Sequence, residues 1–205
     1  MKNRLPLITI DNFFETPSLV RNFALQQEYF KGDRGNWPGL RSNFLDEVDI
    51  TLFHTFASKL VHHIPDKNSF SILQTSFQII DDTYGSGWIH TDDDKYNVAG
   101  MVYLNPDPTP INSGTTFYND RMDVNGDDYS KMFMEEVNSD DIEGRRKYDQ
   151  YRKDHRSQWI PSITVQNRFN RCNIFDPRVW HSADNFFGKD IDTARLTLVF
   201  FGHAI

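Results

Sequence analysis

The sequence predicts a mostly β fold, an antiparallel sandwich with helices packed outside it. From residue 69 onward the chain consists of short runs rich in Phe, Ile, Thr, Val and Tyr, separated by Gly, Asn, Asp and Pro, which is typical of sheet-forming segments. The first 68 residues instead hold two stretches with apolar residues at helical spacing. Aromatic residues make up 14% of the chain and include 17 Phe, enough to fill an apolar core.

The N-terminal region, residues 1–68, is expected to support the sheet from outside. An apolar run over residues 7–10 predicts a strand. Thr16 and the proline after it mark the start of a helix over residues 17–29, because Pro is favoured at the first helical position. A Gly-rich loop over residues 31–43 follows, and then a second amphipathic helix over residues 49–63.

Residues 69–205 are expected to form the sandwich, and the 205 residues together fit one domain. The predicted strands cover residues 69–80, 87–90, 97–104, 115–118, 163–166, 171–176 and 194–202.

A charged insertion, residues 124–162, interrupts the predicted strands. Opposite charges at helical spacing, such as Asp149 with Arg152 or Lys153, indicate a solvated helix. A long insertion beside a site often shapes it. A solvated decoration without catalytic consequence is the other interpretation.

The bulk charge and the cysteine count restrict the partners and the compartment. A net charge of −7 argues against a nucleic-acid partner, which requires an excess of Lys and Arg. Cys172 is the only cysteine, so an internal disulfide and an all-thiolate zinc site are excluded, and a reducing cytoplasmic compartment is expected. No apolar run approaches the roughly 20 residues of a membrane span, and the N-terminus lacks the pattern of a signal peptide.

The segment from Tyr84 to Asp92 contains the first candidate metal ligands. In a regular strand alternate side chains share a face, so His90 and Asp92 would project together, about 7 Å apart at their Cα atoms. A His-x-Asp triplet also arises by chance, and a His beside a carboxylate usually forms only an ion pair. Asp93 would face away from His90, and Asp94 lies one repeat further, which favours Asp92 as the ligand.

His181, which follows a second predicted strand, strengthens the case. Two imidazoles and one carboxylate on one face of a metal form the facial triad of non-haem iron oxygenases, which leaves open positions for a cosubstrate and dioxygen. A structural zinc would normally complete its tetrahedron with cysteines that this chain lacks. The predicted metal is Fe(II), bound by His90, Asp92 and His181.

Arg195 is a cation in an otherwise apolar strand, and burying a guanidinium requires an anionic partner. Alternation places Thr197 on the same face. A planar fork beside a hydroxyl suits the distal carboxylate of a dicarboxylic cosubstrate. The alternative is an ion pair with a protein carboxylate such as Asp184 or Asp192.

Three aromatic residues adjoin the predicted ligands and are candidates for the substrate pocket: Tyr84, Trp88 and Trp180. Alternation favours Trp88, since it would share a face with His90 and Asp92. Aromatic side chains beside a site are about as often plain core.

Taken in order, these motifs resemble the prolyl 4-hydroxylase-like branch of the Fe(II)/2-oxoglutarate-dependent dioxygenases. The resemblance spans residues 70–203, and several ordered motifs are more specific than any one of them. They are Tyr84-Gly85, His90-x-Asp92, the run from Met101 to Asn105, the run from Ser113 to Phe117, Phe175-Asp176, Trp180-His181 and Arg195-Leu196-Thr197.

The resemblance implies a double-stranded β-helix, a cupin-like jelly roll, with the metal in its open mouth. It implies that the His90, Asp92 and His181 side chains bind iron, and that Arg195 and Tyr103 hold the far carboxylate of 2-oxoglutarate. It also implies hydroxylation of a C–H bond in a peptide, protein or small-molecule substrate, with release of succinate and CO2, and no catalytic residue beyond the metal ligands.

His181 and Arg195 are 14 positions apart, longer than is typical of prolyl hydroxylases, with residues 185–190 resembling a loop insertion. Two alternatives remain open: a metal-binding jelly-roll module without activity, and a cupin-type metalloenzyme that does not use 2-oxoglutarate.

Overall fold

The computed structural model describes residues 5–31, 37–119 and 142–205. Its strands form two sheets, with all pairings antiparallel: a seven-stranded sheet in the order β1-β8-β5-β10-β4-β3-β2 and a three-stranded sheet in the order β7-β6-β9. The strands are β1 (Ile8–Ile10), β2 (Tyr29–Lys31), β3 (Leu40–Phe44), β4 (Phe70–Ile80), β5 (Val98–Tyr103), β6 (Thr115–Tyr118), β7 (Pro161–Val165), β8 (Cys172–Phe175), β9 (His181–Ala183) and β10 (Arg195–Ala204).

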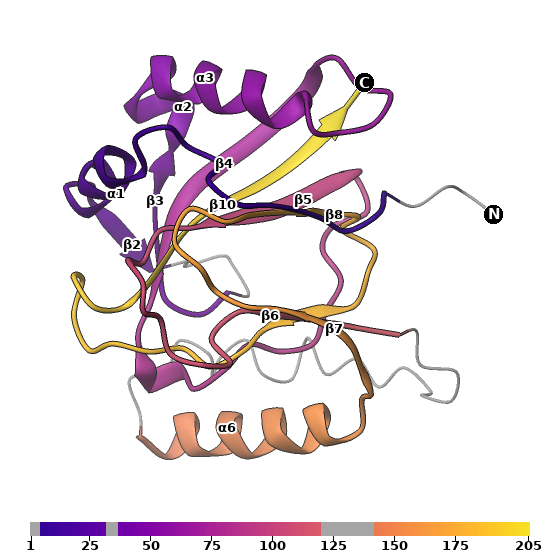
Figure 1. Cartoon of the computed structure of the whole chain (residues 1–205). Coiled ribbons are helices and arrows are strands. Elements are labelled where there is room, and N and C mark those ends of the chain that lie inside the picture. The colour runs from indigo at the N-terminus through magenta and orange to yellow at the C-terminus, as the bar shows by residue number, and fades with distance from the viewer. Residues whose placement is uncertain (1–4, 32–36, 120–141) are drawn as a thin grey trace.

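The helices lie on the outer sides of this sandwich (Figure 1). They are α1 (Pro17–Leu25), α2 (Leu45–Val48), α3 (Ile50–Val61) and α6 (Ile142–Ser157), with a 3-10 turn, η1, at Asp82–Tyr84. α1, α2 and α3 cover the large sheet, whereas α6 lies at the other side of the molecule, beyond β6 and β7. The predicted fold class, a jelly-roll core with N-terminal helices packed outside, is confirmed.

The main core fills the space between the large sheet and α1 to α3. Leu196, Leu198 and Phe200 of β10 are fully buried there and belong to one apolar cluster with Phe56 and Leu60 of α3. Burying each such side chain contributes roughly 1.5–3 kcal/mol. Asp49 begins α3 by accepting hydrogen bonds from the backbone of Thr51 and Leu52, as expected of a helix cap.

The other face of β10 points between the two sheets, because neighbouring residues of a strand alternate. Arg195, Thr197 and Phe201 lie on this inner face. Cross-strand pairing aligns Thr197 with Tyr103 of β5 on one side and with Gln78 of β4 on the other. The inner face of the large sheet is therefore the floor on which a polar site is built.

Two predicted boundaries in the N-terminal region are wrong for identifiable reasons. The helix predicted over residues 17–29 ends at Leu25, because Tyr29 begins β2. The loop predicted over residues 31–43 runs into β3, whose pairing with β4 outweighs its polar sequence.

The strand predicted over residues 87–90 is not formed. Only isolated bridges occur there, at Ser86 and His90, and Gly85 before them has a positive φ of 68° that breaks an extended chain. The short strand β9, which supplies the bridging partner of His90, was not predicted.

The charged insertion is described from residue 142 onward. Residues 120–141 and the side chain of Asp149 lie outside the described residues. The predicted helix is present as α6, and the predicted end of the insertion at residue 162 overlaps β7. Within residues 5–31, 37–119 and 142–205, no helix is both long and apolar enough to cross a membrane.

Candidate active site

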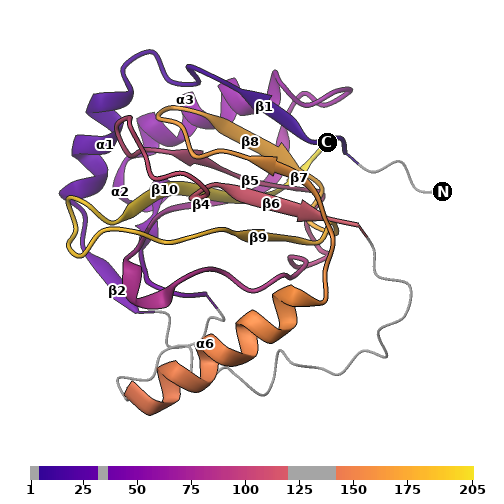
Figure 2. The ribbon, with the colours of Figure 1, turned by 60° about the horizontal axis from the view of Figure 1, so that its bottom comes forward.

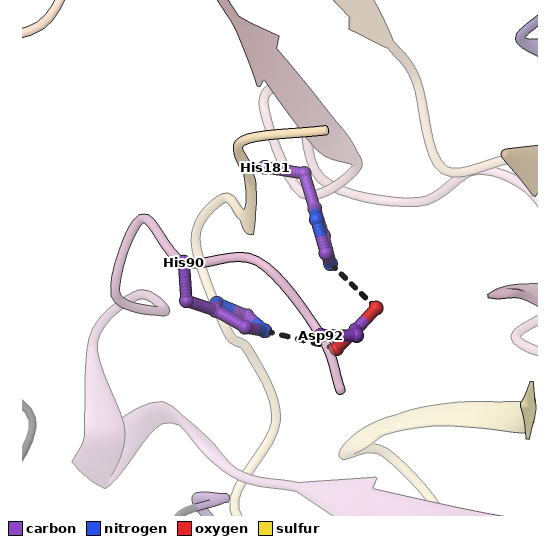
Figure 3. Close-up of side chains that lie close together, drawn as sticks. All are labelled: His90, Asp92 and His181. Carbon is purple, nitrogen blue, oxygen red and sulfur yellow. Dashed lines mark ion pairs between the residues drawn. The ribbon is translucent and has the colours of Figure 1, made fainter. Parts of the chain in front are cut away.

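His90, Asp92 and His181 converge at the mouth of the sandwich (Figure 3). Each offers one ligand atom, and these atoms all lie within 4.8 Å of one another. Nε2 of His90 is 3.5 Å from Oδ1 of Asp92, and Nε2 of His181 is 3.5 Å from Oδ2 of the same carboxylate. Asp92 therefore lies between the two imidazoles, and its oxygens face both of them.

Backbone pairing brings these residues together. His90 and His181 form an isolated antiparallel bridge, with reciprocal N–H to carbonyl hydrogen bonds of 3.0 and 2.9 Å. The Asp92 amide donates to the carbonyl of Pro177 at 2.8 Å. His90 and Asp92 thus converge through these backbone hydrogen bonds and not through the side-chain alternation of a regular strand, which the sequence had predicted.

Both imidazoles are oriented by a backbone carbonyl two residues earlier. Nδ1 of His90 lies 2.9 Å from the carbonyl oxygen of Trp88, and Nδ1 of His181 lies 2.9 Å from that of Val179. When Nδ1 carries the proton and donates to these carbonyls, Nε2 of the neutral ring is an acceptor. Such carbonyls commonly orient histidine ligands of metals.

The protonation of the three groups follows from their surroundings. Burial lowers the pKa of His181 to about 4, so this imidazole is neutral near pH 7. Burial also opposes the charged form of His90, but the hydrogen bond and charge of Asp92 outweigh it and raise the His90 pKa. For Asp92 burial favours the neutral acid, yet the neighbouring histidines and Arg41 lower its pKa.

Oδ2 of Asp92 is a buried acceptor without a hydrogen-bond donor among the described residues. A buried carboxylate oxygen without a donor is costly, and a bound cation removes that cost. Two imidazole nitrogens beside this oxygen form a donor set that suits Fe(II) and related divalent metals.

Arg195 lies deeper between the sheets and is only 3% exposed. Its Nε donates to the Ser113 carbonyl at 3.4 Å, and its guanidinium lies over the rings of Tyr103 and Phe186, at 5.4 and 5.8 Å from their centroids. Across the described part of the chain, no carboxylate oxygen lies within 4 Å of this guanidinium. The cation is therefore buried among aromatic rings and has no anionic partner in the described ranges.

The ion pair considered as the alternative for Arg195 is not formed. Asp184 instead pairs with Arg156 at 3.2 Å and accepts from the Thr116 hydroxyl at 2.9 Å. No ion pair joins Arg195 to Asp192 either, within the same described ranges. The charge of Asp184 still acts on Arg195 and favours its charged form, whereas burial lowers the Arg195 pKa.

Two hydroxyls accompany Arg195. Thr197 is fully buried, and its Oγ1 has no hydrogen-bond partner among the residues that the structure describes. The Tyr103 hydroxyl lies 2.7 Å from the Thr115 hydroxyl, and burial raises the Tyr103 pKa, so the phenol is protonated. A guanidinium, a free hydroxyl and a phenol together form a cradle for a carboxylate.

The loop between β9 and β10 does not displace Arg195. Phe186 donates its amide to the Gly85 carbonyl at 2.6 Å, and the Gly188 carbonyl accepts from Asp82 at 2.9 Å. The Arg195 amide donates to the Phe187 carbonyl at 3.1 Å. The additional residues are therefore bound to the segment that precedes His90.

The three aromatic candidates have different surroundings. Tyr84 is buried in a small core cluster with Ile80 and Phe186. Trp88 contacts the ring of His155, with centroids 4.8 Å apart, and Trp180 contacts Trp159 at the same separation. Both partners belong to α6 or to the turn that follows it.

α6 also contributes arginines that the sequence reasoning did not single out as functional. The Arg152 guanidinium donates to the carbonyls of Tyr84 and Ser86. Arg156 donates to the Gly87 carbonyl at 3.1 Å and to the Ser182 hydroxyl at 2.6 Å. α6 thus binds the two segments that carry His90 and His181; the spacing of four residues between these arginines was the available signal.

An open cleft of about 270 Å³ is lined in part by Phe117 and Phe175. Both rings also lie near that of His181, with centroids 6.1 and 4.6 Å from its own. Leu7 and Val179 are further members of its lining. This apolar cleft was not predicted.

The two-sheet jelly roll that carries the His-Asp-His cluster has the fold of prolyl hydroxylases and other Fe(II)/2-oxoglutarate-dependent oxygenases, which confirms the resemblance at the level of the fold. A prolyl-4-hydroxylase from Pseudomonas putida superposes with a TM-score of 0.56 at 13% identity, covering 97% of this chain and 92% of that one.

Two further solved structures have the same fold. HygX from Streptomyces hygroscopicus, with nickel, 2-oxoglutarate and hygromycin B bound, gives a TM-score of 0.58 at 10% identity, covering 97% of this chain and 83% of that chain. A Trichoplax adhaerens prolyl hydroxylase in complex with a hypoxia inducible factor peptide fragment gives 0.56 at 11% identity, covering 96% and 83%. No curated protein matches. The chain belongs to a family of unknown function, DUF6445, whose model matches residues 1–202.

Proposed function

We propose that this protein is an Fe(II)- and 2-oxoglutarate-dependent dioxygenase that hydroxylates a C–H bond and releases succinate and CO2. One observation carries the proposal: a His-Asp-His cluster with an unsatisfied carboxylate oxygen lies in the same sandwich as a buried arginine that has no carboxylate partner among the described residues. A cation and a dianion would satisfy both sites. The general kind of protein agrees with the oxygenase fold.

Nε2 of His90, Nε2 of His181 and a carboxylate oxygen of Asp92 would hold the metal. The bound iron would supply the activation of dioxygen, which amino-acid side chains cannot provide. The Trp88 and Val179 carbonyls orient the two imidazoles, and burial keeps that of His181 neutral. Fe(II) is preferred on donor chemistry, since two nitrogens and one carboxylate leave positions open.

Arg195, Thr197 and Tyr103 would bind the far carboxylate of 2-oxoglutarate. Arg195 supplies charge and donors, Thr197 its free hydroxyl, and Tyr103 a protonated phenol. The walls around them are aromatic, which excludes water and strengthens these charged interactions. HygX, which shares the fold, is described with 2-oxoglutarate and nickel bound.

The substrate class remains broad at this level, a peptide side chain or a small molecule. The fold neighbours are described in complex with both kinds: one with a peptide fragment and another with hygromycin B. We further propose that residues 1–205 act as one oxygenase domain in the cytoplasm, with Trp88 and Trp180 beside the substrate. Tyr84 is the weakest of the three pocket candidates, because it is buried in a core cluster.

The test is succinate formation from 2-oxoglutarate in air. We expect formation to require added Fe(II) and to be abolished in His90→Ala, because two remaining ligands hold the metal poorly. The matched control is His203→Ala, a partly exposed histidine at the end of β10. Activity that survives in His90→Ala would contradict the assignment.

The two alternatives give different results. A metal-binding module without activity would bind iron and form no succinate. A cupin-type enzyme that does not use 2-oxoglutarate would lose nothing in Arg195→Leu, whereas the proposed enzyme would lose its cosubstrate.

A further inference from the structure

A second arginine lies on the floor of the sandwich. Arg41 of β3 pairs in register with Gln78 of β4, Gln78 pairs with Thr197 of β10, and Thr197 pairs with Tyr103 of β5. Directly opposed residues share a face of a sheet, so these four side chains form one row on the inner face. The four strands lie side by side in Figure 1.

Arg41 is held by aromatic side chains. Its guanidinium carbon lies 4.1 Å from the centroid of the Trp37 ring and 5.7 Å from that of Phe201. Stacking on an aromatic face orients the planar guanidinium while leaving its edge free to donate hydrogen bonds. The arrangement resembles that of Arg195 over Tyr103 and Phe186.

The donors of this stacked pair are unsatisfied. Nε of Arg41 and Nε1 of Trp37 are both buried, and neither has an acceptor among the described residues. No carboxylate oxygen within the described part of the chain lies within 4 Å of the Arg41 guanidinium. Each buried donor without a partner is unfavourable, so the pair is built to receive acceptor atoms that the protein does not supply.

Arg41 acts on the metal cluster without pairing with it. Its charge favours the charged form of the Asp92 carboxylate and opposes that of the His90 imidazole, and the register of β3 with β4 places it on the same inner face as Thr197. It lies two strands away from Thr197, about 10 Å at the Cα atoms from the strand spacing. The carboxylate held by Arg195 and Thr197 is therefore a different group from the one that Arg41 could bind.

Charge balance points the same way. In the proposed complex, the metal and Arg195 are matched by Asp92 and by the two carboxylates of 2-oxoglutarate. Arg41 is partly buried and then has no counter-ion among the described residues, which is unfavourable for its buried Nε. An anionic group on the incoming substrate would remove this cost.

We infer that Arg41 and Trp37 form the substrate-recognition subsite of this enzyme and that the substrate carries a carboxylate which the Arg41 guanidinium binds. The inference rests on the proposed function and narrows its substrate class to carboxylic acids. The inner face of β4 agrees with such a substrate, since Gln74, Ser76 and Gln78 share it and make it polar.

The test compares acids with their amides. The probes are a panel of N-acetyl amino acids, each paired with its C-terminal amide, titrated calorimetrically into protein loaded with Ni(II) and saturating 2-oxoglutarate, so that Arg195 is occupied. We expect acids to bind at least about tenfold more tightly than their amides, the effect of one charge-assisted contact. Equal affinities, or no binding of either form, would overturn the inference.

Variants assign the preference to Arg41. Arg41→Leu is expected to abolish the preference for acids, and Arg41→Lys to keep part of it, because the charge remains while the planar stack is lost. Arg168→Leu, an exposed arginine paired with Asp11, is the matched control. If Arg41→Leu instead weakens 2-oxoglutarate as strongly as Arg195→Leu does, Arg41 belongs to the cosubstrate site and the inference is wrong.

A wrong assignment of the carboxylate subsite and a wrong assignment of the oxygenase activity give different experimental results. Failure of the inference leaves Fe(II)-dependent succinate formation in the wild-type protein. Protein that neither binds metal with 2-oxoglutarate nor forms succinate contradicts the proposed function, and the inference with it.

Discussion

Thr197 provides the sharpest single-residue distinction between a structural role and a cosubstrate role. Its hydroxyl is fully buried without a hydrogen-bond partner among the described residues, so in the free protein it is a cost. Thr197→Val removes the hydroxyl at nearly constant shape. We expect the melting temperature to stay equal or rise, while the Kd for 2-oxoglutarate rises about fivefold to tenfold, the loss of one hydrogen bond.

The matched control is Thr75→Val. The Thr75 hydroxyl is also buried but donates to the Val199 carbonyl at 2.9 Å. This variant should lose about 1 kcal/mol of stability and leave the Kd for 2-oxoglutarate unchanged. A Thr197→Val protein that is destabilised like the control, with unchanged cosubstrate affinity, would assign Thr197 to packing.

His90 determines how metal binding responds to pH. A protonated imidazole cannot bind a metal, and His90 has a pKa above its ordinary value of 6.5, whereas His181 protonates only at about 4. Asp92, whose pKa is lowered, is charged throughout this range. Mn(II) affinity should therefore fall about tenfold per pH unit as the pH drops below the pKa of His90, with one proton displaced.

Calorimetry with Mn(II) between pH 8 and pH 5.5 measures this slope. A slope of two protons would mean that His181 also titrates in that range. Constant affinity over the whole range would exclude His90 as a ligand.

At the scale of elements, α6 lies beside the small sheet (Figure 2), and its arginines donate hydrogen bonds to the segments that carry His90 and His181. Arg156 joins the carbonyls of Gly87 and Ala183 and pairs with the largely buried Asp184. Burial raises the pKa of Asp184, while Arg156 lowers it.

Arg156→Met should destabilise the protein by about 1–3 kcal/mol, because it leaves a buried acid without its partner. The measurement is chemical unfolding at pH 7. Combining Arg156→Met with Asp184→Asn should recover part of the loss, and Lys153→Met on the exposed face of α6 should change little. An Arg156→Met variant with unchanged free energy of unfolding would show that α6 does not stabilise these segments.

The strands also show which elements the sequence patterns could predict. Strands rich in apolar, aromatic or β-branched residues, namely β4, β5, β6, β8 and β10, were predicted nearly at their observed bounds. Short or polar strands such as β3 and β9 were not, because they depend on pairing with distant partners and not on their own residues. His90 and Asp92 were selected correctly as neighbours in space, although a bridge to β9 and not strand alternation brings them together.

At the scale of the whole molecule, ordered motifs predicted the jelly roll and the positions of its polar residues. They could not predict that Arg195 lacks a carboxylate partner among the described residues, since that depends on the pairing of Asp184 with Arg156 of α6. Nor could they predict the Trp37 stack, which forms only when β3 joins the sheet edge.

The central claim is that one site binds a metal and 2-oxoglutarate together. The direct measurement is the absorption difference when Fe(II) and then 2-oxoglutarate are added to the protein without oxygen. The account predicts a visible charge-transfer band that needs both components, disappears in His181→Ala, and in Arg195→Leu requires a much higher 2-oxoglutarate concentration. Wild-type protein that gives no band, or a band unaffected by either variant, would contradict it.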